Sequence, residues 1–220
     1  MKNLELENIN LNHRIATFIK EGYNRFICEV MIENNTIECY VSSSSKLSHF
    51  IPLENRKVLI RKNEGKKLRT KYTLQAVWED QNKSLLNLNY LNNVFENYLD
   101  STDWKREYIV NKNLKTDFIN IKENKLIEVK GILSEEKTTL FPIVYSERAI
   151  KQLKEYNKLL KKGFKVEYAL VFLNENSIDF TLNKEEKIFC KAFKSCLKNG
   201  MTVNKYQIKW NNYTPYIERI

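Results

Sequence analysis

Apolar and polar positions alternate over several short stretches in the first part of the chain. A period of two predicts β-strands, because successive side chains of a strand point to opposite faces of its sheet. Turn residues such as Asn34 and Asn35 separate the stretches. Several short strands in one run are typical of a small barrel. The predicted strands span residues 13–20, 25–32, 36–41, 57–61 and 69–77.

Near residue 85 the apolar period changes to that of an amphipathic helix. The apolar residues that recur there at helical spacing are Leu88, Leu91, Val94, Phe95 and Tyr98. The elements predicted after this helix are a hairpin over residues 117–133, helices over 146–163 and 184–198, and strands over 166–173 and 203–210. This order predicts an α/β domain after the barrel, and an α+β protein as a whole.

Two stretches rich in β-branched and aromatic residues flank the polar tetrapeptide KENK and predict the hairpin. If Glu123 and Asn124 form a two-residue turn, Ile119 lies opposite Glu128, and Asp117 lies opposite Lys130 two positions further on. Side chains alternate along a strand, so Asp117, Glu128 and Lys130 are expected on one face of the hairpin.

Two neighbouring carboxylates repel each other unless a cation lies between them or they share a proton. Mg²⁺ is the candidate cation for Asp117 and Glu128, because it prefers oxygen ligands. Without metal, neutralising either acid is expected to leave stability unchanged or to raise it. An ordinary surface ion pair remains the alternative, because 29% of the residues are charged and the acid-any-Lys triplet occurs six times.

The composition favours a polyanionic partner. The chain has 37 Lys and Arg against 27 Asp and Glu, a formal charge of +10, and phosphates release counterions to such a surface. An AT-rich coding bias toward Lys, Asn and Ile would raise the charge as well. No run of about 18 apolar residues and no signal peptide is found, so we expect a cytoplasmic protein without a membrane partner. The four scattered cysteines are expected to be reduced core residues.

The segment KNEGKKLRTKYTLQ is a basic cluster at the end of the predicted barrel. On a strand, Lys67, Arg69 and Lys71 would share one face and form a positive stripe. Small barrels bind single-stranded nucleic acid with such stripes and with stacking aromatic rings. A solvated charged face is the alternative interpretation.

The order of several motifs resembles the sugar fermentation stimulation protein family of bacteria and archaea, over nearly the whole chain. The motifs are GYNRFICEV from Gly22, RKNEGKKLRTKYTLQAV from Arg61, NNVFENYL from Asn92, TDFINI and IEVKG in the hairpin, FPIVYSERAIKQL from Phe141, and VEYALVFL. The resemblance implies an OB-like barrel over residues 1–84 that binds nucleic acid. It implies a PD-(D/E)xK nuclease-like α/β domain over residues 85–220.

Carried over residue by residue, the resemblance implies that Asp117 and Glu128 are catalytic metal ligands and that Lys130 is the catalytic lysine. Glu96, on the preceding helix, would be a further metal ligand. Arg25, in the GYNRFICEV motif, joins the basic stripe as a nucleic-acid-binding residue.

Four residues after the Phe-Pro pair are expected at the rim of the active site. Glu147 and Arg148 match an acid and a base of the family, and Gln152 and Tyr156 are similar to a Gln-Tyr pair of related nucleases. From the residues alone, Gln152 and Tyr156 are interpreted as plain helix surface.

The chain departs from the family at the YVSSSSKL segment from Tyr40, where the family has an HCPNTG-like loop. It also has Ile143 in place of Asp and Ala149 in place of Gly. The resemblance implies a nuclease that uses Mg²⁺ or Mn²⁺ on DNA or RNA. The alternative is a catalytically inactive, non-specific DNA-binding regulator of sugar metabolism. The oligomeric state stays open, with a homodimer as one candidate.

Overall fold

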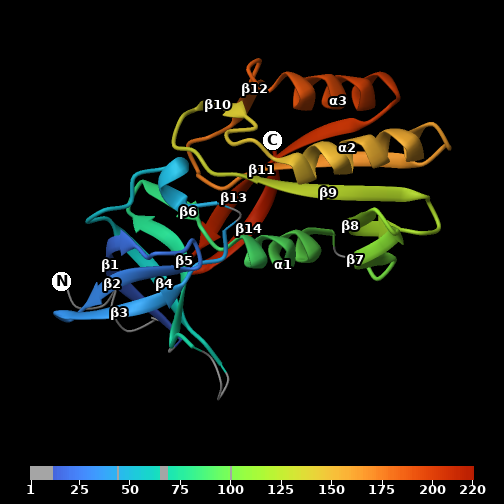
Figure 1. The fold of residues 1–220 in the computed structure, drawn as a ribbon. Coiled ribbons are helices and arrows are strands. Elements are labelled where there is room, and N and C mark those ends of the chain that lie inside the picture. The colour runs from blue at the N-terminus through green and yellow to red at the C-terminus, as the bar shows by residue number, and fades with distance from the viewer. Residues whose placement is uncertain (1–11, 44, 65–68, 100) are drawn as a thin grey trace.

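The structure, a computed structural model, describes residues 12–43, 45–64, 69–99 and 101–220. In this part the chain forms two six-stranded sheets, one two-stranded sheet and three α-helices. Figure 1 shows the first sheet at one end of the molecule and the second sheet, with its helices, at the other. The predicted order of a small barrel followed by an α/β part is confirmed.

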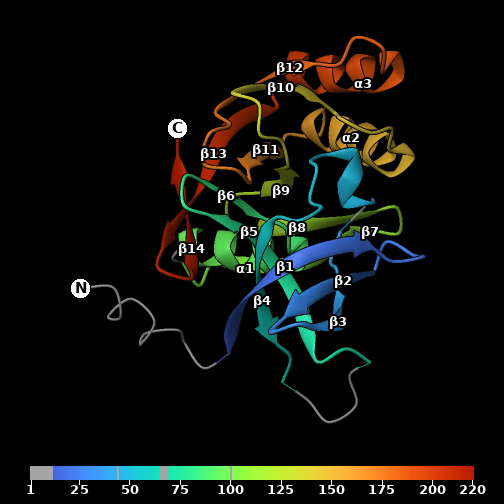
Figure 2. The same cartoon turned by 90° about the vertical axis from the view of Figure 1, so that its left-hand side faces the viewer.

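The first sheet has the strand order β3-β2-β1-β4-β5-β6. Its strands are β1 (His13–Glu21), β2 (Ile27–Ile32), β3 (Asn35–Tyr40), β4 (Lys57–Lys62), β5 (Tyr72–Glu79) and β6 (Asn82–Leu85). β3 also pairs in parallel with β5, where Cys39 lies opposite Tyr72. This extra pairing closes the sheet into a barrel, which Figure 2 views from its outer end.

The basic stripe differs from its prediction. β5 begins at Tyr72, so Arg69 and Lys71 precede the strand and do not share one of its faces. Both side chains are exposed. Lys67 lies outside the described residues. The basic residues that the structure describes here therefore belong to a loop at the end of the barrel.

The second sheet has the strand order β14-β13-β11-β9-β8-β7. Its strands are β7 (Trp104–Asn111), β8 (Leu114–Asn120), β9 (Lys125–Ile132), β11 (Lys165–Phe172), β13 (Thr202–Asn211) and β14 (Thr214–Arg219). The central strands β9, β11 and β13 are parallel. The expectation that the strand over 203–210 is the last one is wrong, because β14 follows it, and β7 was not predicted.

Three helices cover the second sheet. They are α1 (Leu88–Leu99), α2 (Glu147–Leu160) and α3 (Lys187–Lys198). Figure 1 shows α2 and α3 on one face of the sheet and α1 on the other. The short strands β10 (Thr138–Phe141) and β12 (Asp179–Leu182) pair in parallel beside α3, and a 3-10 helix, η1 (Leu47–His49), follows β3.

The barrel and the second sheet share one hydrophobic core. Val77 and Leu85 of the barrel belong to the same buried cluster as Val171 and Leu173 from the second sheet. Arg56 joins the two parts at the surface, where its guanidinium donates to Glu79 of β5 at 2.7 and 3.2 Å and to Glu135 at 2.6 Å. The two parts therefore bury apolar surface against each other.

The four cysteines are buried and free, as predicted. Among the described residues, no helix combines the length and the hydropathy needed to span a membrane.

Candidate active site

β8 and β9 form the predicted hairpin with a different turn. Ile119 pairs with Leu126 instead of Glu128, and residues 121–124 form a four-residue loop. Asn124 adopts a φ of 51° there, which asparagine tolerates better than most residues. The pairing is shifted by two residues, and because the side-chain period of a strand is also two, every side chain keeps its predicted face.

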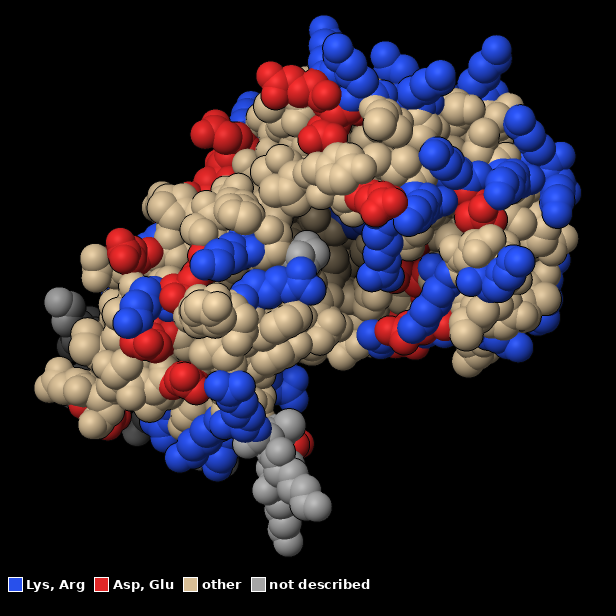
Figure 3. Space-filling model, in the orientation of Figure 1, with Lys and Arg blue, Asp and Glu red and all other residues tan. Residues whose placement is uncertain are grey.

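A pocket of about 320 Å³ opens between the barrel and the second sheet, and Asp117, Glu128 and Lys130 all line it. The space-filling view shows a hollow between the two parts near the middle of this face (Figure 3). Barrel-side residues of the wall include Leu47 and Phe50. The structure thus brings together the three residues that the hairpin pattern and the family resemblance single out.

Glu128 is the most firmly held group of the pocket. Its side chain is 3% exposed, and its Oε1 accepts a hydrogen bond from Lys130 Nζ at 2.6 Å. Its Oε2 accepts a hydrogen bond from the Tyr156 hydroxyl. Lys130 Nζ also donates to Gln152 Oε1 at 3.1 Å. Two side chains of α2 therefore hold the hairpin's acid and lysine in place.

The interpretation of Gln152 and Tyr156 as helix surface is wrong. Both are buried on the inner face of α2. Ser146 caps the start of this helix, where its Oγ accepts a hydrogen bond from the Ala149 amide. The helix places apolar residues at i, i+3 and i+6 from Ile150, so this face must pack on the sheet. Gln152 and Tyr156, four residues apart, are carried inward with it.

Asp117 is held differently, and its carboxylate is destabilised. Its Oδ2 accepts a hydrogen bond from the Val129 amide at 2.8 Å, and its Oδ1 accepts one from Asn92 Nδ2 at 3.2 Å. Burial disfavours the charged form and Glu128 repels it, which raises the pKa of Asp117 from 3.8 to about 6. Lys130 and the two hydrogen bonds offset only part of this shift.

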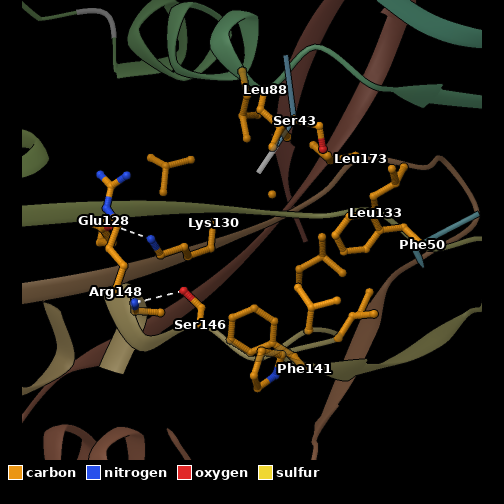
Figure 4. A pocket seen from close by; sticks show the side chains of 18 of the residues that line it. Ser43, Phe50, Leu88, Glu128, Lys130, Leu133, Phe141, Ser146, Arg148 and Leu173 are labelled. Carbon is orange, nitrogen blue, oxygen red and sulfur yellow. Dashed lines mark hydrogen bonds and ion pairs between the residues drawn. The ribbon is translucent and has the colours of Figure 1, made fainter. Parts of the chain in front are cut away.

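The remaining predicted residues divide between the pocket and the surface. Arg148 lines the pocket, and Figure 4 shows it near Glu128 and Lys130. Glu147 is exposed and pairs with Lys151 at 2.8 Å. Glu96 is half exposed and pairs with Arg106 at 3.1 Å, outside the residues that line the pocket.

Asn92 is the site residue that sequence reasoning missed on α1. It lies one helical turn before Glu96 and contacts Asp117. Asn92 and Glu96 are four residues apart in NNVFENYL, so their side chains lie at neighbouring positions of one helix face. The sequence pattern therefore makes Asn92 as good a candidate site residue as Glu96. An amide donates to an ionised carboxylate, whereas a third acid would repel it.

The donor set fits a hard divalent cation. Among the described residues, no group of three or more His, Cys, Asp and Glu side chains gathers closely enough to hold a metal by itself. Asp117 and Glu128 offer carboxylate oxygens on the pocket wall. Mg²⁺ commonly binds one or two carboxylates and takes its other ligands from water and phosphate. The pocket is therefore suited to a metal that shares its coordination with a phosphate substrate.

Tyr168 lies in the wall of the pocket and differs from Tyr156 in the hydrogen bonding of its hydroxyl. It is fully buried and lines the pocket, and its hydroxyl has no hydrogen-bond partner among the residues that the structure describes, whereas the equally buried Tyr156 donates to Glu128. We expect Tyr168→Phe to raise the free energy of unfolding by about 1 kcal/mol, and Tyr156→Phe to lower it by about 1 to 3 kcal/mol. Urea denaturation of both variants measures this. Equal losses of stability in the two variants would show that the Tyr168 hydroxyl is bonded after all.

A second concave surface lies on the barrel. A cavity of about 420 Å³ is lined by Phe26, Tyr40 and Arg69, among others. The guanidinium of Arg25 lies 4.7 Å above the Phe26 ring, and Lys71 Nζ lies 5.8 Å from the centroid of the Tyr72 ring. The barrel therefore presents cations on loops beside the exposed Phe26 ring, whereas the Tyr72 ring on β5 is buried.

Lysines of α2 and α3 form a cationic surface that sequence reasoning also missed. Figure 3 shows blue side chains gathered over this end of the molecule. The exposed lysines of the two helices are Lys151, Lys154, Lys158, Lys187, Lys191, Lys194 and Lys198. Their recurrence at three- and four-residue spacing in the sequence was the available signal.

Comparisons with known proteins match both halves of the chain. The family model described as the SfsA N-terminal OB domain matches residues 21–86, and the one described as the sugar fermentation stimulation protein RE domain matches residues 81–214. A sugar fermentation stimulation protein homolog of Pelagibacter ubique is 26% identical, over 86% of this chain and 88% of the relative. A homolog of Clostridium beijerinckii is 29% identical, over 82% of this chain and 84% of the relative.

A solved structure, described as Pyrococcus furiosus SfsA in complex with Ca²⁺, superposes with a TM-score of 0.77. It is 19% identical in sequence and covers 94% of this chain and 93% of its own. The likeness shows that the fold is shared. Together with the two family models, it shows that the chain belongs to the sugar fermentation stimulation protein family, with an N-terminal OB domain followed by the family's RE domain.

Proposed function

We propose that this protein binds nucleic acid and hydrolyses phosphodiester bonds with Mg²⁺ or Mn²⁺ in the pocket of Asp117, Glu128 and Lys130. The observation that carries the proposal is the meeting of two carboxylates and a lysine in one pocket between the OB domain and the second sheet. The raised pKa of Asp117 adds to it, because a divalent cation would relieve the repulsion between the two acids.

Each residue then has a role. Asp117 and Glu128 would hold the metal, and a bound metal would polarise the scissile phosphate and lower the pKa of a water molecule. Lys130, fixed by Glu128 and Gln152, directs its ammonium group into the pocket, where it orients the attacking water or offsets developing negative charge. Arg148 is placed to bind a neighbouring phosphate. The Pyrococcus relative is described with Ca²⁺, another hard divalent cation.

The substrate path would run from the barrel to the pocket. The OB domain supplies the cation and ring pairs near Phe26, and small barrels bind single strands by combining such groups. The lysines of α2 extend the positive surface away from the pocket, because α2 begins beside Arg148. Phosphates on either surface would release counterions, so the binding would be sensitive to salt and tolerant of sequence.

A salt titration tests the barrel part of this path. The binding constant K for a single strand falls as salt rises, and we expect Arg69→Ala/Lys71→Ala to make this dependence shallower. The slope of log K against log salt should become less negative by about 1.4, roughly 0.7 for each phosphate that the variant no longer neutralises. The matched control is Lys112→Ala/Lys122→Ala, which removes the same charge from exposed loop positions of the second sheet. Equal changes in the two variants would show that net charge, and not the barrel, sets the slope.

A cleavage assay tests the proposal as a whole. Purified protein is incubated with single- and double-stranded DNA and RNA, each with Mg²⁺, with Mn²⁺ and with chelator. We expect products only in the presence of metal. Absence of metal-dependent cleavage on every substrate, in protein that still binds the substrates, would overturn the catalytic part of the proposal.

A second candidate function is nucleic-acid binding without turnover, which suits a regulator. One observation favours it: each carboxylate oxygen of the pair already accepts a hydrogen bond. Glu128 accepts from Lys130 and Tyr156, and Asp117 accepts from Asn92 and Val129. Each acid thus has hydrogen-bond partners without a metal, as in a nuclease fold that no longer turns over substrate. The same cleavage assay separates the two functions.

A further inference from the structure

The pocket has two chemically different ends. Figure 4 shows Glu128, Lys130 and Arg148 together on one side, and Phe50, Leu133 and Phe141 on the other. Among the described lining residues, the charged ones are Asp117, Glu128, Lys130 and Arg148. The rest of the wall is mainly apolar. A ligand that fills the whole pocket must therefore carry charge at one end and an apolar body at the other.

The apolar end of the pocket, called the chamber below, is lined by residues that pack in or against the shared core. Leu133 and Leu173 are buried, and Phe50 is packed against the shared core. Gly131 lies between the two ends, and its backbone is exposed. A Cβ at this position would come within 3.0 Å of Leu173 Cδ1 and 3.1 Å of Leu91 Cδ2, so a larger residue would press on the two leucines of the wall.

We infer that this chamber receives one unstacked nucleobase while the phosphate of the same or the next nucleotide lies at Lys130 and Arg148. The inference rests on the proposed function and adds the substrate class: nucleic acid with a free end, or with a base turned out of its stack. A base combines flat apolar faces with a linked anion, which matches the two ends of the pocket. Phe50 and Phe141 are aromatic residues of the apolar end on which the base would pack.

Size and polarity agree with a single nucleotide. A volume of about 320 Å³ lies at the lower end of the range for small-ligand pockets, roughly 300 to 1,000 Å³, and cannot admit a duplex. Unstacking costs least at a chain end or at an unpaired position, so such nucleotides would enter first. The apolar walls offer few hydrogen-bonding side chains for the edge of a base, so little discrimination among the bases is expected.

The test uses the fluorescence of 2-aminopurine, which is quenched by stacking on neighbouring nucleobases and recovers when the base leaves them, because a phenylalanine ring is a weak quencher. Oligonucleotides carry it at the 5′ end, at the 3′ end, at an unpaired position or within a duplex, and Ca²⁺ replaces Mg²⁺ to slow cleavage. At saturating protein, we expect a several-fold rise for at least one end or unpaired position and none within the duplex. An unchanged signal at every position would overturn the inference.

Two variants fill the chamber from different walls. Leu88→Trp and Ile143→Trp enlarge half-buried lining residues on α1 and on the segment before α2, and both should abolish the fluorescence rise while binding of the oligonucleotide persists. If one variant fails to fold, the other decides. The control is Leu197→Trp, at an exposed position of α3, which should keep the full rise. A full rise in a folded filled variant would place the base elsewhere and overturn the inference.

The outcomes also separate this inference from the proposed function. If the protein binds and cleaves nucleic acid without any fluorescence rise, the proposed function is supported and the inference about the chamber is overturned. If the protein binds no oligonucleotide, both the proposed function and the inference are overturned. An excess of deoxynucleoside monophosphate identifies the source of the bound nucleotide. Reversal of the rise would support a site that also accepts free nucleotides, and no reversal would support one restricted to a nucleotide held in a chain.

Discussion

Glu128→Gln should reduce Mg²⁺-dependent cleavage by at least about 10²-fold while the affinity for nucleic acid changes little or rises. Removing one electrostatic group of a catalytic centre typically costs a factor of about 10² to 10³. Binding should persist because the change removes a negative charge that faces the phosphate. Product formation under single-turnover conditions and binding in Ca²⁺ measure the two effects.

Glu167→Gln is a closely matched control for this prediction. Glu167 is also a buried glutamate of the second sheet, and it pairs with Lys125 at 3.0 Å and accepts a hydrogen bond from Tyr206 at 2.5 Å. Its Lys and Tyr partners repeat those of Glu128, but it lies outside the pocket. We expect Glu167→Gln to disturb the fold by a comparable amount and to leave cleavage in place. An equal loss of cleavage in both variants would assign the effect to folding.

Asp117→Asn should stabilise the metal-free protein by about 1 to 3 kcal/mol at pH 8. The folded protein holds the proton of Asp117 with a pKa of about 6, against 3.8 ordinarily. This raised pKa favours folding fully below about pH 4, and the benefit is lost as the pH rises to 6. Above pH 6 the ionised Asp117 carboxylate destabilises the folded wild type by the full amount, whereas the neutral Asn side chain does not. Urea denaturation at pH 4 and pH 8 should therefore show the advantage only at pH 8.

Mg²⁺ should remove most or all of the stability advantage of Asp117→Asn. The ion binds only the folded hairpin, so at a concentration of 100 times Kd it would stabilise the wild type by roughly 2.7 kcal/mol, and it should do little for Asp117→Asn. Thermal melts with Mg²⁺ and with chelator measure this difference. Equal shifts in the two proteins would remove Asp117 from the proposed metal ligands.

Glu128→Gln should differ from Asp117→Asn in the sign of its effect on stability. The sequence led us to expect that neutralising either acid would be harmless or stabilising, because it treats the two carboxylates alike. The structure distinguishes them: Glu128 has Lys130 and Tyr156 as partners, and its replacement leaves the lysine without its carboxylate. A destabilised Glu128→Gln protein is therefore the expected result, and cleavage must be measured below its melting temperature.

The part of the site on the hairpin could be predicted because the alternation of a strand is robust. The predicted turn is wrong and Ile119 meets a different partner, yet a shift of two residues leaves Asp117, Glu128 and Lys130 on one face. A shift of one residue would have turned all three side chains to the other side. The motif order, through the family resemblance, predicted the order of barrel and α/β part for the same chain.

The rest could not be predicted because it depends on contacts between distant segments. The apolar face of α2 indicates which side of the helix is buried, but nothing within α2 indicates that Gln152 and Tyr156 meet the hairpin. The choice between Asn92 and Glu96 depends on how α1 lies on the sheet. The strands β7 and β14 lie at the edges of the second sheet, and charged residues interrupt their apolar positions.

The core that the barrel shares with the second sheet has a consequence for how the protein can evolve. The wall of the pocket is drawn from both parts: Phe50 comes from the first, and Lys130 and Leu173 come from the second. A recombination that joined this barrel to an unrelated partner would lose the pocket and expose a hydrophobic face in one event. Selection on the site therefore acts on the barrel and the second sheet jointly. A substitution on the barrel side of their shared core constrains which substitutions are tolerated on the other side.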